Sequence, residues 1–181
     1  MTAGGATLAD GRTIGGTVVW TAGFLVPELA RASGLSTDAH GRLLTDETLT
    51  SVDSDRIVAA GDAAAPSGQP LRMSCQAAIP LGAQAANTVL ARLDGDQPAV
   101  ISQAFTGQCI SLGRTGGTIQ IARTNDVPLP LYIGGRTAAT IKEAVCKGTI
   151  SFLRREARKP GSYFWIKGGG TRPAQEAVVT R

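Results

Sequence analysis

The chain has 181 residues, 43% of them hydrophobic and 18% charged, which is enough for one ordinary domain or two small ones with a real core. Aromatic residues make up only 4%, while glycine numbers 23. This composition argues against an all-β sandwich and against a module that stacks RNA bases, and it favours an α/β protein. The net charge is +4.

The first part of the chain predicts short strands and one short helix. Residues 6–12 are expected to form a strand that ends in an Asp-Gly hairpin turn. Residues 17–21 are expected to form a buried strand, because they are β-branched or aromatic. Pro27 suits the first position of a helix that runs to about Ser33 and stops at Gly34.

The middle of the chain predicts a strand followed by a long helix. Short strands at 43–45 and 48–50 precede a strand over 56–62 that ends in Gly-Asp. After a polar loop, an Ala-rich helix is expected over 73–93, where apolar residues recur at helical spacing. Pro80 lies inside it and is expected either to kink the helix or to destabilise it by about 3 kcal/mol.

From residue 102 onwards the pattern changes to paired strands and helices. Residues 109–114 and 117–121 are expected to be two antiparallel strands, followed by an irregular Pro-rich stretch at 127–130. Two helices are then expected, over 136–147 and 149–159.

The cysteines and the histidine exclude several kinds of site. Cys75, Cys109 and Cys146 are odd in number, widely spaced and without a Cys-x-x-Cys pair, so free thiols in a reducing compartment are expected. For Cys75 a packed thiol is favoured over a redox role, because no second cysteine lies nearby in the sequence. The lone His40 is expected in a surface turn, and no metal site is expected.

The location of the protein is expected to be cytoplasmic. The first residues lack a basic stretch followed by an apolar core, so they do not form a signal peptide. No apolar run approaches the roughly 20 residues that span a bilayer. Peripheral attachment at the inner face of the membrane stays compatible with this sequence.

A basic stretch lies near the C-terminus. Between residues 142 and 172, eight Lys or Arg accompany only two Glu. One interpretation is a solvated basic face or tail. The other is a surface that attracts an anionic membrane or nucleic acid, although no RNA-binding signature or zinc-finger spacing accompanies it, so nucleic acid is not expected as a partner.

The Gly61-Asp62 pair is the clearest candidate for a binding site. It ends a predicted strand, and ligands bind at the carboxyl edge of open α/β sheets. Gly61 permits a ligand to approach closely, and Asp62 can accept hydrogen bonds from sugar hydroxyls. The helix that starts near residues 73–76 offers unpaired N–H groups and a positive dipole end. Such an end suits the flavin edge that gains negative charge on reduction.

Four segments in order carry a resemblance to a known family. They cover 18–24, 41–49, 57–64 and 76–87. Together they resemble the C-terminal half of the pyridine nucleotide-disulfide oxidoreductase superfamily, and most of all its type II NADH dehydrogenase group. The resemblance extends over roughly residues 6–150.

The resemblance implies roles for particular residues. The Thr-Ala-Gly segment ending at Gly23 would close the NAD(P)H-binding domain. The segment 61–63 would hold the ribityl and pyrophosphate region of FAD, and amides of 75–77 would point at the flavin. The implied cofactor-binding residues are Gly23, Gly61, Asp62, Ala63, Cys75, Gln76 and Ala77. No residue is assigned as catalytic or as a metal ligand.

Two departures from the family pattern are visible. No Gly-x-Gly-x-x-Gly phosphate loop occurs in the sequence, for FAD or for NAD(P)H. Pro80 stands where type II NADH dehydrogenases commonly carry a glutamine near the quinone, which puts quinone reduction in doubt.

The predicted fold class is therefore an α/β (α+β) fragment of a flavoprotein that lacks the N-terminal Rossmann βαβ units and ends in a small hairpin-and-helix subdomain. Residues 1–25 would end the NAD(P)H domain, 26–97 would belong to the FAD domain, and 98–181 would form the C-terminal subdomain. A subdomain boundary is expected near 95–102.

The expected function is the C-terminal portion of an FAD-dependent NAD(P)H oxidoreductase. The complete enzyme would move hydride from NAD(P)H to flavin and electrons on to an acceptor, for which a quinone is a candidate. The chain alone is not expected to be active, and two copies could pair through open sheet edges. The alternative is a non-catalytic module that binds an anionic membrane surface or nucleic acid through the basic stretch.

Overall fold

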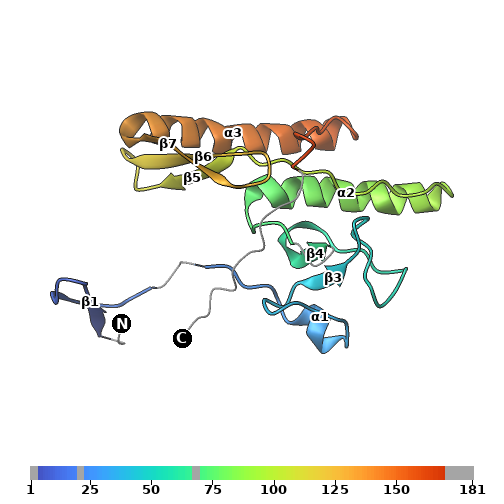
Figure 1. Ribbon diagram of the computed structural model, residues 1–181, viewed down its shortest axis with the longest axis horizontal. Coiled ribbons are helices and arrows are strands. Elements are labelled where there is room, and N and C mark those ends of the chain that lie inside the picture. Colours follow the sequence, from blue (N-terminus) through green and yellow to red (C-terminus); the bar gives the residue numbers. More distant parts are fainter. Residues whose placement is uncertain (1–3, 20–22, 67–69, 170–181) are drawn as a thin grey trace.

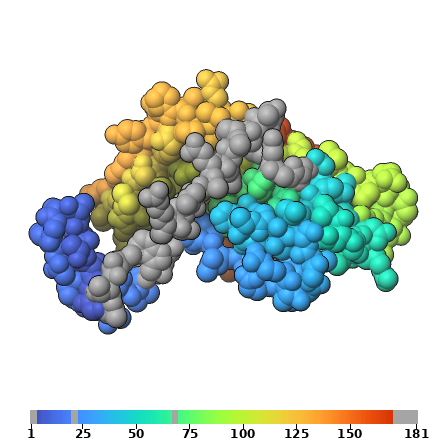
Figure 2. Space-filling model, turned by 60° about the horizontal axis from the view of Figure 1, so that its bottom comes forward, coloured from blue at the N-terminus to red at the C-terminus, as the bar shows by residue number. Residues whose placement is uncertain are grey.

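A hairpin begins the part of the chain that the computed structural model describes, which comprises residues 4–19, 23–66 and 70–169. Strands β1 (Gly5–Thr7) and β2 (Thr13–Gly15) pair antiparallel. The expected strand at 6–12 is thus the first arm and turn of this hairpin, and Gly11 adopts a φ of +84° in the turn. The hairpin stands at one end of the molecule, apart from the helices (Figure 1, Figure 2).

The expected strand at 17–21 is wrong over residues 17–19, which form no strand. Val19 is 77% exposed, so its β-branched side chain does not pack against a neighbouring strand or a buried surface. Residues 20 and 21 lie outside the described residues. The first helix, α1 (Leu29–Ala32), is shorter than predicted at both ends.

A two-stranded parallel sheet lies at the centre of the fold. Strand β3 (Leu43–Thr45) confirms its prediction and pairs with β4 (Ala64–Pro66), which was not predicted. The strand expected over 56–62 is wrong: it has a single bridge at Val58, and its last two residues belong to a 3-10 turn, η1 (Gly61–Ala63). Gly61, with a φ of +63°, turns the chain there, so β4 begins only at Ala64. The strand expected at 48–50 is reduced to one isolated bridge, between Thr50 and Val58.

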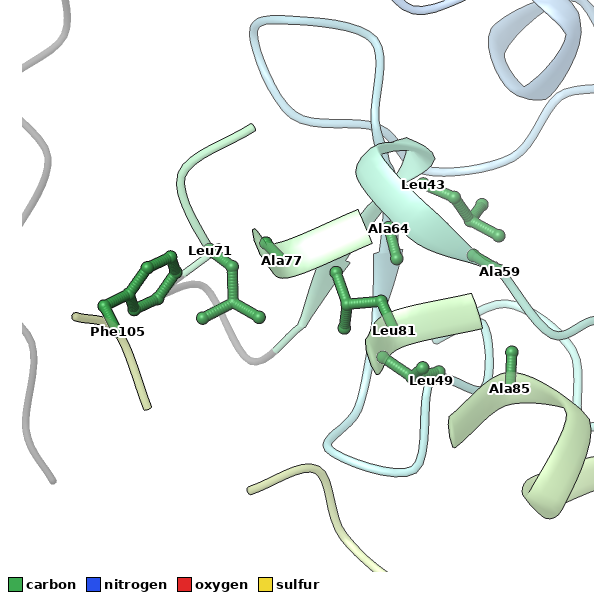
Figure 3. Close-up of a cluster of buried hydrophobic side chains, with 9 residues drawn as sticks. All are labelled: Leu43, Leu49, Ala59, Ala64, Leu71, Ala77, Leu81, Ala85 and Phe105. Atoms are coloured by element: carbon green, nitrogen blue, oxygen red, sulfur yellow. The ribbon is translucent and has the colours of Figure 1, made fainter. Parts of the chain in front are cut away.

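The long helix α2 (Cys75–Leu93) confirms its prediction and covers the core. Ala77, Leu81 and Ala85 recur at helical spacing and are buried against the sheet and its loops. Figure 3 shows this cluster, whose members are Leu43, Leu49, Ala59, Ala64, Leu71, Ala77, Leu81, Ala85 and Phe105.

Pro80 lies inside α2 without ending it. Proline has no N–H, so it cannot donate to the carbonyl of Gln76, four residues earlier. The side chain of Gln103 fills this gap, because its Nε2 donates to Gln76 O at 3.2 Å and to Ala104 O at 2.7 Å. Gln103 is only 4% exposed, and its bond to Gln76 O is part-buried.

A three-stranded antiparallel sheet follows, in the order β5-β6-β7. Strands β5 (Gly107–Ser111) and β6 (Gly117–Ala122) confirm the predicted hairpin. The Pro-rich stretch 127–130, expected to be irregular, instead belongs to β7 (Pro128–Gly134). Because β7 is an edge strand, its prolines can face away from the ladder.

The last helix, α3 (Gly135–Arg158), lies along this sheet (Figure 1). It is one helix and not the predicted two, because Gly148 costs an interior helical position only about 1 kcal/mol. After α3 the chain turns back: Glu156 accepts hydrogen bonds from Gly161 N and Tyr163 N, and Trp165 Nε1 donates to Ser102 O. None of the described helices combines the length and apolar character needed to cross a membrane.

Candidate functional site

A cleft of about 910 Å³ lies between the start of α2, strand β5 and the inner side of α3. One end is polar and contains Ser74, Cys75 and Gln76. The remaining walls are mostly apolar and include Ile79, Pro80, Ile141, Val145, Phe152, Tyr163 and Trp165. A cleft of this size with few polar groups is typical of a site for a small molecule or cofactor.

The start of α2 supplies donors to the polar end of the cleft. Ser74 caps the helix: its carbonyl accepts from Ala77 N at 3.0 Å and Ala78 N at 2.8 Å, and its hydroxyl lies 3.4 Å from Ala77 N. Within the described part of the chain, the N–H groups of Cys75 and Gln76 have no acceptor. They also carry the positive end of the helix dipole. Two donors are therefore free for a ligand.

Ala77 does not have the predicted role. Its N–H belongs to the cap, and its side chain is fully buried in the core. The prediction of amides pointing at a ligand thus narrows to Cys75 and Gln76, because the third amide of a capped helix is already bonded.

Asp62 lies beside this helix start, although it does not line the cleft. Its Oδ1 accepts from Ser74 N at 3.2 Å. Burial raises the pKa of Asp62 above its ordinary value, and the Ser74 N–H and the charge of Arg42 oppose that rise. Among the described residues Asp62 has no salt-bridge partner. Its carboxylate therefore keeps capacity to accept further hydrogen bonds.

Replacing Asp62 by asparagine tests the cost of this burial. The raised pKa means that Asp62 contributes stability at low pH that is lost as the pH rises through the folded-state pKa. Asp62→Asn is expected to raise the free energy of unfolding at pH 7 by less than about 1 kcal/mol, and to lose that advantage below the ordinary carboxyl pKa of about 3.9. Urea unfolding of both proteins, at pH 7 and at a pH below about 3.9, measures the difference in their free energies of unfolding. Destabilisation at pH 7 would contradict this expectation.

The remaining predicted residues do not line the cleft. Gly61 packs against α2, since an added Cβ would meet Ala78 O at 3.6 Å, and its φ of +63° accounts for the glycine. Ala63 is exposed. Gly23 is also exposed, with open space around it, and its neighbour Phe24 is the residue that lines the cleft.

The position of Cys75 differs from its prediction. Cys75 is exposed and lines the cleft, so the prediction of a packed thiol is wrong. Its position as the first residue of α2 places it on the surface of the helix end. Cys109 on β5 lines the same cleft and is half-buried, whereas Cys146 is exposed on α3. All three are free.

Sequence reasoning missed the aromatic wall. Tyr163 and Trp165 are stacked with ring centroids 6.1 Å apart, and Phe152 meets Tyr163 edge-on at 6.4 Å. Burial, followed by the nearby Cys75, raises the pKa of Tyr163. The sequence did contain a signal for this wall, because three aromatic residues follow one another at 163–165 in a chain with few aromatics.

The hydrogen-bond donors and the apolar walls of the cleft match the chemistry of a flavin ring. The two free N–H groups match a carbonyl edge that gains negative charge, and the aromatic and apolar walls match the ring faces. Residues that fit a metal are not found: no group of three or more metal-ligating side chains occurs among the described residues.

Comparison with known proteins finds similarity among solved structures. No protein-family model matches the chain, and no curated protein matches it. A similar solved structure is a ferredoxin reductase for the CYP199A2 system from Rhodopseudomonas palustris, at 21% identity and a TM-score of 0.39. The match covers 73% of this chain and 37% of that one, so this chain spans little more than a third of the neighbour. A likeness at this level carries no argument about family or activity.

Proposed function

We propose that this chain carries the C-terminal part of the flavin site of an FAD-dependent NAD(P)H oxidoreductase. The observation that supports it is the pair of unpaired N–H groups, on Cys75 and Gln76, at the polar end of a cleft of about 910 Å³ with apolar and aromatic walls. The finer assignment to the type II NADH dehydrogenase group rests on the sequence resemblance alone, as do a quinone acceptor and the division at residues 25 and 97.

The residues of this chain would bind and tune the cofactor. When bound, FAD supplies the acceptance of hydride from NAD(P)H and the transfer of electrons to an acceptor. Cys75 and Gln76 N–H would donate to the pyrimidine edge of the ring, where the dipole of α2 favours negative charge. The Asp62 carboxylate, already oriented by Ser74 N, would accept from a ribityl hydroxyl.

The site would be half of a complete one. A parallel sheet is normally a larger one that is covered on both faces, whereas among the described residues β3 and β4 form a sheet of two strands. The sequence also lacks a Gly-x-Gly-x-x-Gly loop to hold the phosphates on a helix N-terminus. Further strands and such a loop would come from another polypeptide segment or chain.

Titration of the chain with FAD, followed by flavin fluorescence and equilibrium dialysis, tests this proposal. Saturable but weak binding is expected, with the flavin lost on dialysis. Tight stoichiometric binding would contradict the half-site. Absence of binding up to about 1 mM FAD, which corresponds to a binding free energy weaker than roughly 4 kcal/mol, would contradict the flavin site.

A second candidate function rests on the outer face of α3. Cys146, Ile150, Leu153 and Ala157 are exposed and follow one another at helical spacing along this face. Lys147, Arg154 and Arg158 border them, and of these only Lys147 has a salt bridge among the described residues. An apolar stripe with a basic border is typical of a helix that lies on an anionic membrane surface.

Sedimentation with vesicles tests this candidate. The chain is expected to sediment with vesicles that contain phosphatidylglycerol at low salt and to be released at about 0.5 M salt, where the Debye length falls below about 5 Å. Lys147→Gln combined with Arg154→Gln is expected to weaken sedimentation several-fold, while Arg12→Gln, at an exposed arginine of the hairpin, is the matched control. Absence of sedimentation at low salt, or equal binding to neutral vesicles, would contradict it.

A further inference from the structure

A second cavity, of about 340 Å³, adjoins the cleft. It is lined by Phe24, His40, Arg42, Arg72, Met73 and Gln108. Four of these residues, Phe24, Arg72, Met73 and Gln108, also line the cleft. A ligand whose ring lies in the cleft could therefore extend into this cavity, which we call the arginine cavity.

The two arginines of this cavity are held in place from outside it. Arg42 has a side chain only 4% exposed, and its Nε donates to Asp38 at 2.6 Å while its Nη1 donates to Leu71 O at 3.1 Å. Arg72 donates through Nε and Nη2 to Asp126, at 2.8 and 2.9 Å. Neither carboxylate lines the cavity.

The remaining guanidinium nitrogens are still able to donate. Within the described part of the chain, Nη2 of Arg42 and Nη1 of Arg72 have no acceptor. The guanidinium of Arg72 also lies over the ring of Phe105, 5.1 Å from its centroid, which further restricts its orientation. Donors fixed in advance bind a ligand without a further cost of ordering.

The chemistry of the lining selects an anion with several acceptor oxygens. Two guanidinium groups, an imidazole and a carboxamide line the cavity, and none of the described acidic residues lines it. Arginine recognises the oxygens of phosphate with paired N–H donors. Asp38 and Asp126 neutralise part of the charge, so the affinity for a single phosphate would be modest.

We propose that the arginine cavity binds a phosphoryl group, and specifically the phosphate of a nucleotide whose ring occupies the cleft. The link to a ring rests on the proposed flavin function, whereas the phosphate site itself rests on Arg42 and Arg72. It would give the chain a phosphate contact of its own, although the sequence contains no glycine-rich phosphate loop.

Calorimetry with inorganic pyrophosphate at low salt tests the phosphate site without any flavin. Saturable binding is expected, and Arg72→Gln is expected to weaken it at least about fivefold. Asp126→Asn breaks the same ion pair but keeps the guanidinium, so binding is expected to be retained or tightened. Arg114→Gln, at an exposed arginine outside the cavity, is the matched control. Lack of saturable binding, or equal losses in Arg114→Gln and Arg72→Gln, would overturn the proposal.

Titration with FMN and with riboflavin, which lacks the phosphate, identifies the source. FMN is expected to bind at least about fivefold more tightly than riboflavin, and Arg72→Gln is expected to remove that difference. Equal binding of both flavins would overturn the nucleotide link, and with pyrophosphate binding retained it would assign the cavity to free phosphate. Pyrophosphate binding without binding of either flavin would contradict the proposed flavin function and leave the phosphate site in place.

Discussion

Replacing Cys75 by proline is expected to weaken FAD binding about tenfold while hardly changing the free energy of unfolding. Proline removes the N–H of the first residue of α2, which is one of the two donors without an acceptor among the described residues. Loss of one hydrogen bond between neutral groups costs up to about 1.5 kcal/mol, which is a factor of about ten in affinity. Proline is favoured at a first helical position, and Ser74 before it already has the extended φ of −174° and ψ of 157° that proline requires.

The matched control is Cys75→Ala, which removes the thiol and keeps the N–H. This variant is expected to bind FAD as the unaltered chain does. Parallel titrations and urea unfolding of the three proteins provide the measurement. If alanine weakens binding as much as proline does, the thiol and not the amide makes the contact. If neither changes it, the start of α2 does not bind the flavin.

Gln103→Ala is expected to destabilise the chain by about 2 kcal/mol, because the carbonyl of Gln76 would lose the donor that replaces the missing N–H of Pro80. An unpaired buried carbonyl costs about 1–3 kcal/mol. The destabilisation caused by Gln103→Ala is expected to depend on Pro80. With Pro80→Ala, residue 80 regains an N–H that can donate to Gln76 O, and Gln103→Ala should then cost about 1 kcal/mol less.

A double-mutant cycle of these two substitutions, measured by urea unfolding, gives the coupling free energy. Gln84→Ala serves as the control, because this buried glutamine on α2 donates to Ala99 O and not to the carbonyl opposite Pro80. Its cost should be the same whether or not the chain also carries Pro80→Ala. Additive effects of Gln103→Ala and Pro80→Ala would contradict the replacement of one bond by the other.

The sequence was most informative where local signals agree. Helix α2 has an apolar stripe, a serine cap and an Asp-Gly end, so its type and length were predictable in spite of Pro80. The β5–β6 hairpin was predictable because its apolar residues are separated by a glycine pair.

Prediction was wrong where pairing or packing over a distance decides the structure. The apolar run before Gly61 reads as a strand, yet only Val58 finds a bridge, and the ladder with β3 starts three residues after Gly61, at Ala64. Strand β7 contains prolines that only an edge position tolerates, and edge position cannot be read from the sequence.

The candidate site was predictable only in part. The start of a helix near residues 73–76 was predictable from local pattern, whereas the choice of Cys75 and Gln76 as binding residues came from the family resemblance and stays a prediction. Tyr163 and Trp165 reach the same cleft only because α3 runs back along the sheet and Trp165 bonds to Ser102. Contacts between residues so far apart in the chain leave no mark in local sequence patterns.

The central claim is that a flavin ring binds in the cleft walled by Trp165. The chain has two tryptophans, so a Trp20→Phe variant leaves Trp165 as the only one. The most direct measurement is the Trp165 fluorescence of this variant during titration with FAD. A parallel titration of free tryptophan corrects for the light that FAD itself absorbs. We expect saturable quenching of the Trp165 emission, weakened about tenfold by Cys75→Pro. Quenching no greater than that of free tryptophan, up to about 1 mM FAD, would contradict the flavin site.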